Sequence, residues 1–115
     1  MLRTLALAAA LPGAALAEGF TVIDLGVTRD RETCMYRAER ALDRYEEELG
    51  LYAVNVSDWV IFAYDLRPGD QDVTITCPIL GEGEGFVNAF LNVHGETTSE
   101  EREATADALE AYWNE

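Results

Sequence analysis

Few residues of this chain have side chains suited to catalysis, because it contains no lysine and a single histidine, His94. The hydroxyl groups of Ser57 and Ser99 could act as nucleophiles beside His94. No Gly-x-Ser-x-Gly nucleophile elbow surrounds either serine, and Ser99 lies at an expected helix start. Carboxylates are abundant, yet nothing in their spacing selects an acid–base pair. We therefore expect neither enzymatic activity nor a cofactor.

Oxygen ligands for a hard cation lie in two expected loops, at residues 67–72 and 94–99. A cation such as calcium accepts carboxylate oxygens. However, the Asp-Gln-Asp run in the first loop lacks the remainder of an EF-hand, and turns favour aspartate in any case. A small metal- or ligand-binding module at this end of the sheet is the alternative to the function favoured below. Its candidate ligands are Asp70, Asp72 and His94.

The Gly-Glu-Gly-Glu-Gly run at residues 81–85 has the glycine content of a phosphate-binding loop. It lacks the Gly-Lys-Ser/Thr of a P-loop, and its two carboxylates would face the phosphate. We therefore expect a hairpin turn.

Charge is distributed unevenly along the chain. All eight basic residues are arginine, against 22 acidic residues, and residues 45–115 hold sixteen of the acids with only Arg67 and Arg102 to oppose them. Such a field repels nucleic acid and anionic membrane surfaces, and it attracts cationic proteins. The alternative is that the charge serves solubility alone.

Residues 1–17 have the pattern of a cleaved signal peptide. An apolar run follows the positive Arg3, and small residues at Ala15 and Ala17 form the cleavage site. Cleavage after Ala17 leaves one domain, residues 18–115, with a formal charge of −15 because only Arg3 is lost. No other stretch is long and apolar enough to cross a membrane. We expect a periplasmic or secreted protein, with no membrane insertion once the signal is removed.

Cys34 and Cys77 are the two cysteines of the chain. A cysteine pair in an exported protein predicts a disulfide. The absence of a Cys-x-x-Cys motif and of further histidines disfavours a metal or redox pair. One difficulty concerns depth: counted from the element starts, Cys34 would lie about 7 Å along its helix and Cys77 about 17 Å along its strand.

Hydrophobic periodicity predicts an α+β domain with the element order β-α-β-β-β-α. Turn chemistry at 67–70 and 81–85 joins the last three strands into an antiparallel meander. We therefore expect a four-stranded, mainly antiparallel sheet with the helices packed on it. The expected strands are residues 19–27, 59–64, 73–77 and 86–93, and the expected helices begin near residues 30 and 98.

The first helix would return the chain, so the first strand should run in the same direction as 59–64. Its neighbour in the sheet is left open. This arrangement groups the start of the first helix with the 67–72 and 94–99 loops, and Gly50 with the 81–85 turn. The expected apolar stripes are Cys34, Ala38, Ala41, Tyr45 and Leu49 on the first helix and Ala104, Ala108, Leu109, Ala111 and Tyr112 on the second. We expect the arginines of the first helix to form a solvated, mixed-charge face.

Strand alternation predicts that the second face of the sheet carries aromatic side chains. An exposed apolar patch of this kind marks a partner surface. The second helix, or a second copy of the protein forming a homodimer, could instead cover it. The candidate surface residues are Phe86, Phe90, Trp59 and Tyr64.

The function that these patterns favour is a non-catalytic, exported binding protein. Its acidic surface, together with the aromatic sheet face, would hold a cationic protein such as a hydrolase or toxin, because opposite fields accelerate encounter.

Overall fold

The computed structural model describes residues 18–79 and 85–115 of the 115-residue chain. The expected signal peptide and most of the expected glycine-rich turn lie outside the described residues, at 1–17 and 80–84. The elements are β1 (Gly19–Thr28), α1 (Arg31–Glu48), β2 (Ala53–Val56), β3 (Val60–Leu66), β4 (Gln71–Thr76), β5 (Val87–Gly95) and α2 (Ser99–Trp113). The protein is therefore an α+β domain, as predicted.

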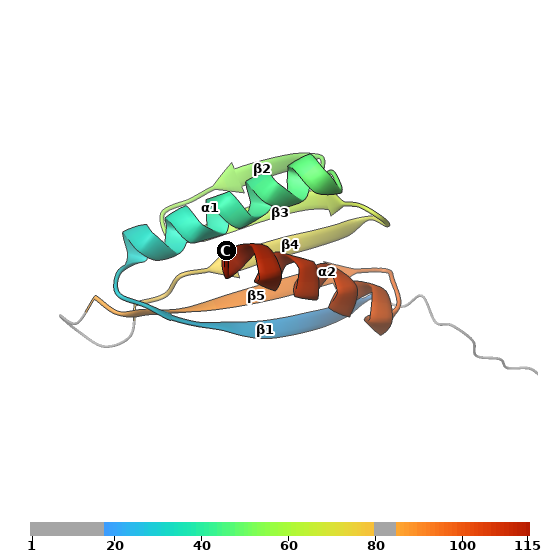
Figure 1. The fold of residues 1–115 in the computed structure, drawn as a ribbon. Coiled ribbons are helices and arrows are strands. Elements are labelled where there is room, and N and C mark those ends of the chain that lie inside the picture. The colour runs from blue at the N-terminus through green and yellow to red at the C-terminus, as the bar shows by residue number, and fades with distance from the viewer. Residues whose placement is uncertain (1–17, 80–84) are drawn as a thin grey trace, which may run out of the picture.

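The strands form one five-stranded sheet in the order β1-β5-β4-β3-β2, and each is antiparallel to its neighbours. Both helices lie on the same face of this sheet, where α1 contacts β3 and α2 contacts β1 and β5 (Figure 1). The side chains predicted to face the helices are buried, and they are Val73, Ile75, Cys77, Val87, Ala89, Leu91 and Val93.

The sheet has one strand more than the four that we predicted: β2 was missed, and its four residues pair with residues 61–64 of β3. This extra strand reverses the chain once more between α1 and β3. As a result β1 runs opposite to β3, so the expected strand direction was wrong, and β1 lies at the sheet edge beside β5. The same reversal changes which loops share an end of the sheet. Gly50 lies beside the 67–72 turn and not at the opposite end, and its carbonyl accepts a hydrogen bond from the Arg67 N–H at 3.0 Å.

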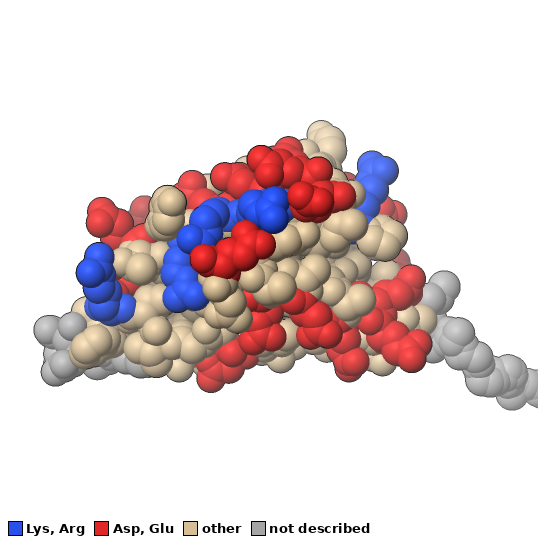
Figure 2. All heavy atoms as spheres, viewed as in Figure 1, with Lys and Arg blue, Asp and Glu red and all other residues tan. Residues whose placement is uncertain are grey.

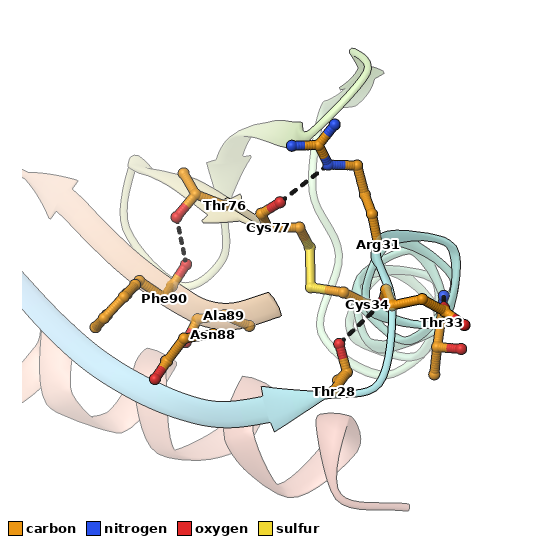
Figure 3. Close-up of a disulfide and its surroundings, with 10 residues drawn as sticks. Thr28, Arg31, Thr33, Cys34, Thr76, Cys77, Asn88, Ala89 and Phe90 are labelled. Atoms are coloured by element: carbon orange, nitrogen blue, oxygen red, sulfur yellow. Dashed lines mark hydrogen bonds between the residues drawn. A yellow bond between two sulfur atoms is a disulfide. The ribbon is translucent and has the colours of Figure 1, made fainter. Parts of the chain in front are cut away.

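Cys34 and Cys77 form the predicted disulfide, with Cα atoms 6.1 Å apart (Figure 3). α1 begins at the end of the sheet where β4 finishes, so the expected mismatch in depth does not arise. Asp30 caps α1 by accepting from the Thr33 N–H at 2.7 Å, and Arg31 donates to the Cys77 carbonyl at 3.2 Å. The start of α1 is thereby tied to the end of β4. The buried residues of α1 are Cys34, Ala38, Ala41, Leu42 and Tyr45.

α2 begins with the predicted capping box. The Thr98 hydroxyl accepts from the Glu101 N–H at 3.1 Å, and the Glu101 carboxylate accepts from the Thr98 N–H at 3.0 Å. Its buried side differs from the prediction, because Ala104 and Ala111 are exposed. The buried stripe includes the polar residues Arg102 and Thr105, so hydropathy alone does not identify it. The buried side chains of α2 are Arg102, Thr105, Ala106, Leu109 and Trp113.

Candidate binding surface

The sheet face opposite the helices carries outward-pointing side chains from all five strands. No helix or loop of residues 18–79 and 85–115 covers it, and Phe20, Val22 and Phe90 expose 66%, 62% and 38% of their surface. We call this surface the open face. Its residues are Phe20, Val22 and Asp24 of β1, Ala53 and Asn55 of β2, Val60, Phe62 and Tyr64 of β3, Asp72, Thr74 and Thr76 of β4, and Asn88, Phe90, Asn92 and His94 of β5.

One end of the open face combines stacked rings with carboxylates. Phe20 pairs with His94 across the strands, and their ring centroids lie 4.6 Å apart. On its other side His94 pairs with Asp72, and its Nε2 lies 3.4 Å from the Glu18 carboxylate. His94 therefore connects the exposed Phe20 ring with two acidic residues, Glu18 and Asp72.

Asp24 is fixed toward the other end of the open face, where it pairs with Phe90. Its Oδ1 accepts from the Gly26 N–H at 2.8 Å and from the Asn88 amide at 2.7 Å. Gly26 lies at a register shift in β1 and has a φ of +94°, a conformation that favours glycine. These hydrogen bonds, chiefly the one from Asn88, hold the pKa of Asp24 below its ordinary value, so this carboxylate is charged at neutral pH.

Asp72 is oriented by a second register shift, between Ala63 and Leu66 of β3. Asp65 lies within it and has a φ of +55°, which is uncommon for a residue other than glycine. Its N–H donates to Oδ1 of Asp72 at 3.1 Å. Each of these two irregularities therefore supplies a backbone donor to an aspartate of the open face, in keeping with the way bulges aim side chains.

The formal charge of the strands is entirely negative. They contain no arginine or lysine, and their acidic residues are Asp24, Asp65 and Asp72. Figure 2 shows the opposite, helix-bearing face, where the basic side chains gather along α1 with acidic ones on either side. The two faces of the sheet thus differ in charge pattern, and the basic residues belong to the helix side.

Three of the four arginines of α1 bind the end of α2 rather than standing free in solvent as we expected. Arg37 donates two hydrogen bonds to the Trp113 carbonyl, at 3.2 and 2.8 Å, and its guanidinium lies 4.3 Å from the indole centroid. Arg40 donates to the same carbonyl at 3.2 Å. Arg44 pairs with Glu115 at 3.0 Å and holds the pKa of that carboxyl below its usual range. These positive charges lie at the C-terminal end of α2, where they interact favourably with the negative end of the helix dipole.

The four aromatic residues proposed from the sequence as a partner surface are all exposed. Phe90 and Tyr64 lie on the open face. Phe86 precedes β5, and Trp59 lies in the connection between β2 and β3, so neither is on a strand. Phe20 and Val22 were missed as surface residues because the neighbour of β1 was unknown. The alternation along residues 19–27 already placed them on one side.

The structure separates the residues proposed for a metal site. Asp72 and His94 are cross-strand neighbours, and Asp70 lies exposed in the β3–β4 turn. Asp30, expected at the same end, caps α1 at the opposite one. Within residues 18–79 and 85–115, no group of three or more His, Cys, Asp or Glu side chains is placed to hold a metal ion.

A cavity of about 150 Å³ lies on the helix side, between the end of α1, the β3–β4 turn and the start of α2. His94 lies on the open face and does not reach it. Glu101 therefore lines the cavity without a histidine beside it. Its lining residues are Tyr45, Leu49, Pro68, Glu101, Ala104 and Thr105.

Comparison with protein-family models, with curated proteins and with solved structures finds no match to this chain. In the part of the chain that the structure describes, no helix has the length and apolarity needed to cross a membrane.

Proposed function

We propose that this protein is a non-catalytic, exported binding protein that holds a basic protein partner against the open face. The observation that carries the proposal is the composition of this face, on which exposed aromatic and aliphatic side chains are interspersed with aspartates and with no arginine or lysine. A partner that buries the apolar groups must also neutralise these aspartates.

The apolar part of the argument rests on β1 and β5. Phe20, Val22 and Phe90 are large apolar side chains that are exposed and not buried in the core. They lie on adjacent strands. Contiguous apolar exposure of this kind marks interaction surfaces on soluble proteins. Aromatic residues are also the side chains that most often anchor protein interfaces.

The electrostatic part of the argument selects the partner. Seven arginines oppose 22 acidic residues in the chain from Glu18 onward, and several of these arginines are engaged with α2. A basic protein is steered toward such a field, and encounter with an acidic one is slowed. A second copy would bring two negatively charged faces together, so we favour a different, basic protein over a homodimer.

Export is supported by the leader expected from the sequence and by the disulfide. Cys34 and Cys77 are joined and buried. Structural disulfides persist mainly in oxidising compartments, so a periplasmic or secreted location accommodates both features.

The proposal is tested by comparing what the disulfide-bonded protein and two variants capture from an envelope extract of the source organism. Phe90→Ser removes an aromatic ring from the open face, and Tyr36→Ser removes an exposed ring from α1 as a matched control. We expect one basic protein, identified by mass spectrometry, to be retained by the wild type and Tyr36→Ser but not by Phe90→Ser. Calorimetry with that purified protein should give the same order.

Salt dependence provides the second readout. Because the attraction is between exposed charges, the affinity should fall strongly between roughly 0.05 M and 0.5 M NaCl. A captured protein that binds Phe90→Ser as tightly as the wild type, or whose affinity does not respond to salt, would overturn the proposal.

A further inference from the structure

We infer that the basic partner presents two arginine side chains to the open face, one beside Asp24 and Phe90 and the other beside Asp72 and the Phe20–His94 stack. This inference rests on the proposed function and specifies the chemistry of the partner. It follows from the juxtaposition of exposed aromatic rings with aspartates at two separate places on one uncovered face.

The first position is formed by the cross-strand pair Asp24 and Phe90. Both hydrogen bonds made to Asp24 end on Oδ1, from Gly26 and Asn88. Oδ2 therefore keeps its capacity to accept a donor from a partner. The Phe90 ring beside it is partly exposed and offers a flat apolar surface.

The second position is formed by Asp72 and the rings of Phe20 and His94. The hydrogen bond from the Asp65 N–H also ends on Oδ1 of Asp72, which leaves Oδ2 available. His94 is the direct cross-strand neighbour of Asp72 and stacks on Phe20, so an acidic residue and an aromatic one occupy adjacent positions of the open face here too.

A guanidinium fits these positions better than an ammonium group. Its planar, weakly hydrated face stacks on an aromatic ring while its edge donates hydrogen bonds to a carboxylate. The ammonium group of lysine is a compact, strongly hydrated charge that gains less from an adjacent ring. Bidentate hydrogen bonding to a carboxylate already favours the guanidinium, and stacking on a neighbouring ring adds to that preference, so both features of this arrangement select arginine.

The sheet geometry sets the spacing of the two arginines. Asp24 and Asp72 are two strands apart, and their cross-strand partners Phe90 and His94 are four residues apart along β5. Strand spacings of about 4.8 Å and rises of about 3.4 Å per residue place the two positions roughly 17 Å apart. Five residues of extended chain span about this distance.

The test titrates three peptides into the ¹⁵N-labelled, disulfide-bonded protein and follows amide chemical shifts. The probe is acetyl-Arg-Gly-Ser-Gly-Ser-Arg-amide. The second peptide replaces both arginines by lysine, and the third has the composition of the probe with its two arginines adjacent. We expect the probe to shift the signals of Asp24, Asp72, Phe90 and His94, with at least threefold higher affinity than either control peptide.

Charge-matched variants locate the effect. Asp24→Asn combined with Asp72→Asn should weaken binding of the probe at least fivefold. Asp43→Asn combined with Asp107→Asn, which removes two exposed aspartates from the helices, should leave it within a factor of two. Near-ultraviolet circular dichroism confirms that both double variants keep the native packing.

The outcomes separate this inference from the proposed function. Equal affinity for the arginine and lysine peptides, or equal affinity for the spaced and adjacent arginines, overturns the inference while the capture experiment with Phe90→Ser still stands. Shifts confined to α1 and α2 overturn it as well. So does the absence of any shift with all three peptides at 10-fold the roughly millimolar Kd expected of such short ligands. Failure of the proposed function is shown separately, by a captured protein that does not distinguish Phe90→Ser from the wild type.

Discussion

The backbone N–H of Asp65 donates a hydrogen bond of 3.1 Å to Oδ1 of Asp72. Asp65 reaches this position through a φ of +55° at a register shift in β3. At the far edge of the sheet, the Gly26 N–H donates to Asp24 from the register shift in β1. Irregular strand geometry is costly and persists where surrounding structure enforces it. Here it orients two carboxylates on the face that we propose as the binding surface.

Asn88→Ala should raise the pKa of Asp24, because the Asn88 amide is the main cause of its depression. A carboxylate with a lowered native pKa stabilises the fold above its unfolded pKa of about 3.9, and this contribution is lost as the pH falls through the native pKa. Carboxyl ¹³C titration measures the shift directly. The pKa of Glu101, which is lowered by its hydrogen bonds with Thr98 and not by Asn88, serves as the internal control. An unchanged Asp24 pKa in Asn88→Ala would contradict the assigned cause.

Breaking the Cys34–Cys77 disulfide should destabilise the protein by about 3–4 kcal/mol, because the bond closes a loop of 43 residues in the unfolded chain. Urea denaturation of the Cys34→Ser, Cys77→Ser double variant against the oxidised wild type measures this difference. Adding a reductant should shift the wild-type midpoint and leave that of the variant unchanged. Equal midpoints for the two oxidised samples would show that the bond contributes no net stability.

Gly19→Ala should destabilise the junction between β1 and α2. A Cβ at this position would clash with the guanidinium of Arg102, and Arg102 is buried and donates to the Gly95 and Thr97 carbonyls. A double-mutant cycle tests the cause. Gly19→Ala should cost less stability in an Arg102→Ala background than in the wild type, with a coupling of about 1 kcal/mol. Strictly additive effects would contradict the contact as the source of the cost.

Arg37→Met should destabilise the packing of α2 on α1 by about 1–2 kcal/mol. It removes two hydrogen bonds to the Trp113 carbonyl and the contact of the guanidinium with the indole ring. Arg29→Met is the matched control, because the Arg29 side chain is 81% exposed and its loss should change stability by less than about 0.5 kcal/mol. The free energy of unfolding from denaturant titration compares the two. An equal, small effect of both substitutions would remove the structural role assigned to Arg37.

Local patterns predicted the elements whose signals are self-contained. The stripe of Cys34, Ala38 and Tyr45 placed α1, and strand alternation put Cys77 on the side facing it. The capping box of Thr98 and Glu101 located the start of α2. Each of these features depends on residues a few positions apart, so the sequence alone contains them.

Features that depend on long-range pairing were missed or wrong. β2 has only four residues, too few for a clear alternation, and its omission reversed the direction assigned to β1. The buried side of α2 was misassigned because Arg102 and Thr105 make it look polar. Two of the four residues proposed for the partner surface, Phe90 and Tyr64, lie on the open face. Phe20 and Asp24 required the pairing of β1 with β5, which no local pattern specifies.

Cross-saturation transfer on the complex with the captured basic protein tests the central claim most directly. Irradiating the partner should reduce the amide intensities of Val22, Thr74 and Phe90, whose side chains lie on the open face, and leave those of Asp43 and Asp107 on the helices unchanged. Saturation concentrated on α1 and α2, with the open-face signals unaffected, would contradict the account.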